Sequence, residues 1–177
     1  KISDNMYSTL GFELVNINHP KESKYSSAIG YGRTFIWGKK NYLFSVRGQY
    51  GREMILFSKK DEQGIRINAQ LAAGPSIGLQ VPYYLKYSRN NRMEIENFDP
   101  NTQTFNNVIG SASFFEGLGE LKIKPGINIK ASVNFEFSPS KSATALEVGF
   151  LGDFYPGGVN IMPTAREYSF YPTAFIT

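Results

Sequence analysis

The sequence predicts an all-β protein in which antiparallel, up-and-down strands form a transmembrane β-barrel of about eight strands around a filled polar lumen. Strict alternation of apolar and polar residues recurs along most of the chain, which is the pattern of strands with two different faces. The longest alternating run covers residues 65–87, although a membrane-crossing strand needs only about 9 to 11 residues and strands of globular proteins average about 5 to 6. Long and short connections alternate between the runs, as they do in outer-membrane barrels.

Six segments are expected to form strands, namely 6–17, 42–57, 65–87, 121–137, 145–155 and, more weakly, 168–177. In the segment 121–137 every odd position from Leu121 to Phe137 is apolar, and every even position is polar or glycine. Pro75 and Pro125 lie within two of the strands, and because proline lacks an N–H group we expect regular pairing to fail there. Eight strands is the usual minimum for a closed barrel. Two more are therefore expected from 25–38, from 103–115 or from sequence outside this chain.

The connections predict one domain, residues 1–177, with long loops at one end and tight turns at the other. The long connections are 18–40, 88–120 and 156–167, and the short ones are 58–64 and 138–144. No segment has a convincing helical period, and residues 114–121 are expected to form at most a short helical turn. The apolar runs are also far too short for a transmembrane helix.

The polar face of the strands predicts a lumen filled by side chains. It combines glycine, alanine and serine with charged residues of both signs, which suits a narrow interior, and buried charges persist only when they are paired. We therefore expect an interlocked ionic network and an apolar outer face in contact with lipid. The residues expected in this network are Glu13, Arg47, Glu53, Arg66, Lys122, Lys124, Lys130, Glu136, Glu147 and Asp153.

The sequence gives little support for catalysis, for a cofactor or for nucleic-acid binding. His19 is the only histidine and stands beside Pro20, a setting more typical of a turn than of a catalytic base. There is no cysteine, and no metal-ligand cluster, phosphate-binding loop or nucleophile elbow is recognisable. Residues 97–103, "NFDPNTQ", are interpreted as a turn and not as a calcium loop. The 19 basic and 15 acidic residues interleave, so no basic stripe favours nucleic acid.

Four segments resemble a known family when they are taken together in order. They are "NINHPKESK" (16–24), "FIWGKKNYLFSVRGQYGRE" (35–53), "AAGPSIGLQVPYY" (72–84) and "IGSASFFEGLGELKIKPG" (109–126). The chain resembles, over about residues 16–155, small outer-membrane β-barrel proteins of the Bacteroidota, some of which are associated with the type IX secretion system. The resemblance implies a further Gly-rich strand segment before the first residue present here and an aromatic-ending last strand that runs beyond "AFIT" (174–177). The resemblance implies an outer membrane (Gram-negative) location and a non-enzymatic, accessory or anchoring role in protein secretion.

On such a barrel the function belongs to the exposed loops, which are expected to contact protein partners in a membrane or secretion complex. The candidates are His19, Pro20, Lys21, Glu22 and Lys24 in one loop, and Phe98, Phe114, Phe115, Glu116 and Leu118 in the other. The phenylalanines are interpreted either as partner anchors or as residues that fold their loop onto the barrel rim. Two alternatives remain: a soluble lipocalin-like barrel that binds an apolar ligand, and a membrane-embedded lipid-modifying enzyme that uses His19.

Overall fold

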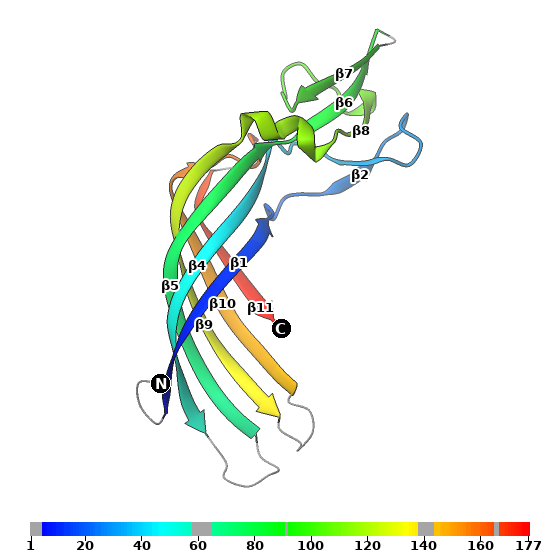
Figure 1. Cartoon of the computed structure of the whole chain (residues 1–177). Helices are drawn as coiled ribbons and strands as arrows, with labels where there is room; N and C mark the ends of the chain where they lie inside the picture. Colours follow the sequence, from blue (N-terminus) through cyan, green and yellow to red (C-terminus); the bar gives the residue numbers. More distant parts are fainter. Residues whose placement is uncertain (1–4, 58–64, 91, 138–143, 165–166) are drawn as a thin grey trace.

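A computed structural model describes residues 5–57, 65–90, 92–137, 144–164 and 167–177, and one large curved sheet dominates it (Figure 1). Six long strands form this sheet: β1 (Met6–Ile17), β4 (Asn41–Phe57), β5 (Ile65–Pro82), β9 (Lys122–Phe137), β10 (Thr144–Val159) and β11 (Tyr168–Ile176). They are antiparallel and follow one another in the order β1-β4-β5-β9-β10-β11. The expected up-and-down meander is therefore confirmed, and the predicted strand boundaries agree to within one residue except at 65–87 and at 145–155, where the strand continues to Val159.

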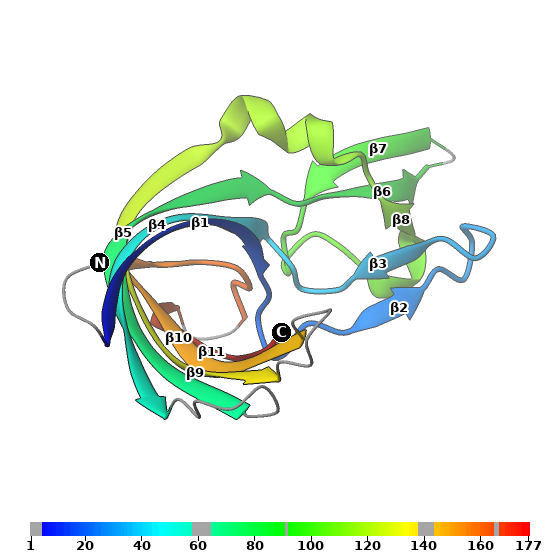
Figure 2. The same ribbon diagram turned by 60° about the horizontal axis from the view of Figure 1, so that its bottom comes forward.

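The sheet curls strongly without closing (Figure 2). Within the described residues, β1 pairs only with β4 and β11 pairs only with β10, so both edges of the sheet lack a partner strand. The expectation of a closed barrel of about eight strands is thus not met by this part of the chain.

The two segments expected to supply the extra strands form separate small sheets beyond one end of the large one (Figures 1 and 2). One sheet pairs β2 (Lys24–Ser26) with β3 (Thr34–Ile36), and the other has the order β7-β6-β8. Its strands are β6 (Tyr84–Arg89), β7 (Arg92–Asn97) and β8 (Val108–Ser111). We call these two sheets, with their connections, the cap. Neither 25–38 nor 103–115 extends the main sheet, so two of the three expected sources of further strands are wrong.

The predicted strand 65–87 is divided at Tyr83, where the chain leaves the large sheet and enters the cap. Pro82 ends β5, and the Tyr83 N–H bonds to the Lys40 carbonyl and not to a ladder partner. In the described part of the chain the helical residues form two 3-10 segments, η1 (Phe105–Asn107) and η2 (Phe114–Glu120), the second of which is the expected short turn. None of the described helices has the length and apolar character needed to cross a membrane.

Burial on the large sheet is the reverse of that in a water-soluble β-protein. Apolar side chains on the convex face are exposed, and the exposed fraction is 88% for Leu10 and 76% for Phe12. Polar and charged side chains on the concave face are buried, with Arg47 3% and Asp153 0% exposed. Strand alternation produces this two-sided pattern, because successive side chains point to opposite faces.

Two apolar clusters fill the end of the molecule that carries the cap. The first lies at the mouth of the curved sheet and comprises Ile17, Leu43, Tyr155, Val159, Ile161, Met162 and Tyr171. Here the connection between β10 and β11 bonds to the start of β4, since the Lys40 and Asn41 N–H groups donate to the Ile161 carbonyl. The second cluster is the core of the cap, and it comprises Phe35, Tyr83, Leu85, Tyr87, Phe98 and Val108.

The prolines interrupt pairing on one side of their strands only. The β4–β5 register passes from Arg47–Ser76 to Tyr50–Ala73, leaving the positions opposite Pro75 and Gly74 unpaired. The pairing of β5 with β9 continues through both Pro75 and Pro125, whereas the pairing of β9 with β10 ends at Ile127. The expected failure of regular pairing at Pro75 and Pro125 is therefore confirmed for one neighbouring strand of each.

Candidate functional site

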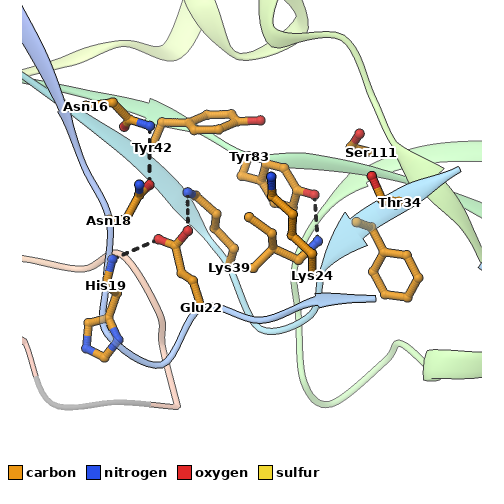
Figure 3. A pocket seen from close by; sticks show the side chains of 12 residues that line it. Asn16, Asn18, His19, Glu22, Lys24, Thr34, Lys39, Tyr42, Tyr83 and Ser111 are labelled. Atoms are coloured by element: carbon orange, nitrogen blue, oxygen red, sulfur yellow. Dashed lines mark hydrogen bonds and ion pairs between the residues drawn. The ribbon is translucent and has the colours of Figure 1, made fainter. Parts of the chain in front are cut away.

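The loop that follows β1 is held by its own polar side chains at the rim of the curved sheet (Figure 3). The Glu22 N–H donates to the His19 carbonyl at 2.9 Å and closes a turn, while the His19 N–H donates to Glu22 Oε1 at 3.0 Å. The His19 ring is buried, lies 5.5 Å from the Tyr168 ring, and accepts a hydrogen bond from the Lys21 N–H at Nδ1. Burial lowers the pKa of His19. His19 thus occupies a turn, as expected, and its ring is committed to local packing.

Glu22 also forms a buried ion pair that sequence reasoning missed. Its Oε2 atom lies 2.7 Å from Nζ of Lys39, which is 1% exposed and sits 4.6 Å above the Tyr42 ring. Burial lowers the pKa of Lys39, and the hydrogen bond to Glu22 opposes that effect. Lysine is almost never fully buried without a partner, yet no pattern in the sequence distinguishes Lys39 from the exposed lysines around it. Of the other candidates in this loop, Pro20, Lys21 and Lys24 are exposed.

The phenylalanine candidates fall into two groups. Phe98 is 4% exposed in the cap core, where its ring lies 4.9 Å from that of Trp37. Phe114 packs against Tyr42 and Phe44 at ring distances of 5.6 and 5.4 Å. Phe98 is therefore not available to a partner, and both residues join their loop to the rest of the fold.

The second group lies on η2 and is exposed to solvent; it comprises Phe115, Glu116 and Leu118. Phe115 is 75% exposed, and Leu118 and Glu116 are also exposed.

The segment 97–103 forms a turn with a structural role, because Asp99 Oδ1 accepts a hydrogen bond from the Asn101 N–H at 2.9 Å, as in an Asx turn. Among the residues that the structure describes, no three His, Cys, Asp or Glu side chains gather in an arrangement that would hold a metal ion.

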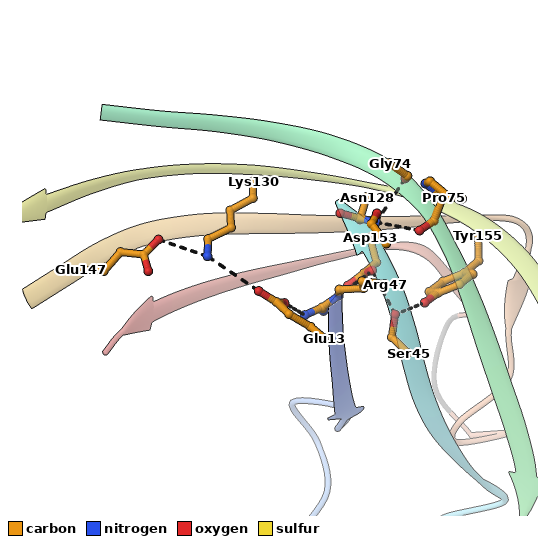
Figure 4. Close-up of polar contacts among 11 residues, drawn as sticks. Glu13, Ser45, Arg47, Gly74, Pro75, Asn128, Lys130, Glu147, Asp153 and Tyr155 are labelled. Carbon is orange, nitrogen blue, oxygen red and sulfur yellow. Dashed lines mark hydrogen bonds and ion pairs between the residues drawn. The ribbon is translucent and has the colours of Figure 1, made fainter. Parts of the chain in front are cut away.

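The concave face of the large sheet contains an ionic network formed by five of the ten expected residues (Figure 4). Arg47 bonds to Asp153 through two nitrogen atoms, with Nε at 3.0 Å from Oδ1, and lies 3.2 Å from Glu13. Lys130 lies 3.6 Å from Glu13 and 3.1 Å from Glu147, so these five residues form one continuous chain of charges. Glu13 on β1 and Lys130 on β9 are not on neighbouring strands. The curl of the sheet therefore brings side chains together across the concave face.

The other predicted members of the network lie apart from this chain of charges. Arg66 and Glu136 form a separate, half-exposed pair at 3.7 Å. Within the described residues no ion pair involves Glu53, Lys122 or Lys124. Lys122 is exposed near the cap end of β9, where water can solvate its charge.

Uncharged polar groups extend the network and were not recognised in the sequence. The Tyr155 hydroxyl lies 2.6 Å from Ser45 Oγ, which in turn donates to Asp153 at 3.2 Å. The Asn128 amide donates to the carbonyls of Gly48, Gly74 and Pro75 at 3.0–3.2 Å. Several buried atoms on this face have no protein partner, including Gln49 Nε2, Ser76 Oγ and Ser132 Oγ. The concave face is thus lined largely by buried polar groups.

Comparison of the chain with protein-family models, with curated protein sequences and with solved structures found no match.

Proposed function

We propose that this chain forms the wall of a small outer-membrane β-barrel with a filled lumen and that it serves as a non-enzymatic accessory or anchoring component of a type IX-like secretion assembly. The observation that carries the membrane part is the reversed burial of the large sheet. A water-soluble protein rarely exposes a continuous apolar face of this kind, because its contact with water is unfavourable. Hydrocarbon is the solvent that favours an apolar exterior around a polar, paired interior.

The composition of the convex face supports a lipid environment. On that face of the six strands in the described part of the chain, the only charged residue is Arg52, and its long apolar stem can carry the guanidinium toward an interface. The convex face also has an apolar groove of about 820 Å³ that crosses the sheet between Met54 and Phe150. Such a surface suits acyl chains.

The open edges of the sheet require further strands if the wall is to stand in a membrane, because unpaired N–H and C=O groups are costly in hydrocarbon. Glu13 and Val15 on β1 and Thr173 and Phe175 on β11 line one cavity of about 350 Å³. The two edges are therefore close, and the ion pairs that bridge the concave face match the side-chain-filled interior of a barrel of about eight strands. We infer that about two further antiparallel strands complete the wall.

The role in secretion rests on the ordered motifs of the sequence and on the surface of the cap. Phe115 and Leu118 are exposed on η2, which connects β8 of the cap to β9. Exposed aromatic residues of this kind are common anchors in protein interfaces. The cap is therefore the surface we assign to a protein partner.

The polar interior argues against the lipocalin-like alternative, which needs an apolar cavity for its ligand. The buried concave residues include Ser45, Arg47, Asn68 and Asp153. The enzyme alternative needs an accessible base, whereas the His19 ring is buried against Tyr168.

Fluorescence quenching by brominated lipid tests the membrane assignment. Trp37 is the only tryptophan and lies in the cap, so Trp37→Phe provides a silent background into which Phe12→Trp is introduced. In vesicles with brominated acyl chains, the fluorescence of the introduced tryptophan should fall strongly, because Phe12 points outward from β1. The wild-type chain, with Trp37 in the cap, is the matched control and should be quenched much less. Equal and weak quenching of both proteins would refute insertion of the sheet.

A further inference from the structure

A polar cavity of about 440 Å³ lies between the rim of the curved sheet and the cap (Figure 3). Its walls come from the end of β1, the following loop, the first residue of β2, β3, the segment that leads into β4 and its first residues, Tyr83, and the end of β8. The volume falls within the range of small-molecule sites in proteins. The cavity lies apart from the ion pairs of the concave face and from the exposed surface of η2.

The cavity has an excess of positive charge. Lys24 and Lys39 line it together with one carboxylate, that of Glu22. Both carboxylate oxygens of Glu22 are already engaged, Oε1 by the His19 N–H and Oε2 by Lys39 Nζ. The Lys39 ammonium has three N–H donors and spends one of them on Glu22. The charged groups that line the cavity therefore carry a net positive charge.

The remaining lining supplies neutral hydrogen-bonding groups beside aromatic rings. Asn16 and Asn18 contribute amides that bond to each other at 3.2 Å, and Thr34 and Ser111 contribute hydroxyl groups. The Tyr83 hydroxyl accepts from the Ile36 N–H at 3.0 Å, and burial raises its pKa to about 12, so it stays protonated. The Tyr42 ring forms part of the same wall. Amides and hydroxyls beside an aromatic ring suit a hydroxylated ligand, whose polar edge and apolar face need different surfaces.

We propose that this cavity binds a small hydroxylated carboxylate of the sugar-acid class, with the carboxylate between Lys24 and Lys39 and the hydroxyls on the Asn16–Asn18 side. Charge-assisted hydrogen bonds to the two ammonium groups supply affinity for the anion. The neutral donors and acceptors supply selectivity for a hydroxylated molecule, because an analogue without hydroxyls leaves them unpaired. The site does not depend on membrane insertion of the large sheet.

Calorimetric titration of the full chain in detergent with three probes tests the ligand class. D-glucuronate carries both features, acetate carries only the charge, and D-glucose carries only the hydroxyls. Glucuronate should bind at least about tenfold more tightly than either of the others, a difference of about 1.4 kcal/mol. Absence of saturable glucuronate binding at millimolar concentration, or equal affinity for glucuronate and glucose, would overturn the proposal.

Two lysine variants test the position of the site. Lys24→Gln removes an exposed charge that lines the cavity, and it should weaken glucuronate binding by about tenfold. Lys21→Gln removes an exposed charge from the same loop, outside the cavity lining, and should leave binding unchanged. The double variant Glu22→Gln with Lys39→Met should abolish binding without leaving an unpaired buried charge. If that variant does not fold, the Lys24 and Lys21 pair decides alone, and equal affinities in the two variants would contradict the site.

Discussion

Arg47 on β4 and Asp153 on β10 form a two-point ion pair across the concave face, although β5 and β9 lie between their strands in the sheet. Both side chains are almost completely buried. A planar guanidinium and a carboxylate fit each other in this geometry, and the pair joins two strands that only the curl of the sheet brings together. We therefore expect the pair to stabilise the curled shape of the large sheet.

Breaking this pair should destabilise the protein more than any single change at the half-exposed pair of Arg66 and Glu136. Asp153→Ala leaves the Arg47 guanidinium buried with only Glu13 in reach, and removal of one partner of a buried pair costs about 3–5 kcal/mol. Urea unfolding in detergent measures the loss in the free energy of unfolding, with the heat-dependent shift in gel migration as the readout of the folded fraction. Arg66→Gln is the control and should cost no more than about 1 kcal/mol, since that pair is 3.7 Å apart and half exposed.

Replacing both partners should recover much of that stability. The double variant Arg47→Met with Asp153→Leu keeps side-chain volume and leaves no unpaired guanidinium at this position. It should be clearly more stable than Asp153→Ala. A double variant as unstable as the single one would show that the charges themselves, and not the cost of an unpaired one, hold the sheet.

Asn128 substitutes for a hydrogen bond that Pro75 cannot make. Its amide donates to the carbonyls of Gly48 and Pro75 where β4–β5 pairing is interrupted. Asn128→Ala should therefore leave buried carbonyls unsatisfied and cost about 1–3 kcal/mol. In a Pro75→Ala background, where the ladder regains an N–H group, the same change should cost less. Equal costs in the two backgrounds, measured by urea unfolding, would contradict this role.

Much of the large sheet was predictable because alternation is a local signal. The boundaries of β1, β4 and β9 follow the sequence pattern to within one residue, since each strand separates two different environments along its whole length. The cap was not predictable in the same way. Segments such as Lys24–Ser26 and Thr34–Ile36 are too short to show a period, and their partners are set by contacts such as the Tyr83 hydroxyl with Ile36.

The candidate sites likewise combine features that a local sequence pattern predicts with features that depend on contacts between distant residues. The charges of the concave face could be predicted as a set, because they occupy the polar side of the strands. Which charges form ion pairs depends on the curl of the sheet, so the ion pair between Lys130 and Glu13 could not be predicted from the sequence. The buried Lys39 and the bridging Asn128 were missed because their roles come from contacts with groups distant in sequence.

A charge placed on the convex face separates a membrane wall from a water-soluble sheet. Phe12 is 76% exposed near the middle of β1. In a bilayer, Phe12→Arg should lower the free energy of unfolding by about 2–4 kcal/mol, because arginine is costly at the midplane. In a soluble sheet the same substitution would be neutral or would improve solubility. Folding titrations in lipid vesicles measure the difference, and Lys122→Arg at an exposed strand end is the control that should have little effect.

The two groups of phenylalanines in the cap should respond to truncation in opposite ways. Phe98→Ala opens a hole in the cap core, so it should cost about 3–5 kcal/mol of local stability and expose cap amides to hydrogen exchange. Phe115→Ala removes an exposed ring, so the free energy of unfolding should change by no more than about 0.5 kcal/mol.

If η2 binds a secretion partner, Phe115→Ala should nonetheless reduce co-purification of that partner from outer membranes. Thr102→Ala, an exposed change elsewhere in the cap, is the matched control. Undiminished co-purification by Phe115→Ala, and by its combination with Leu118→Ala, would remove η2 as the docking surface and leave the membrane wall unaffected.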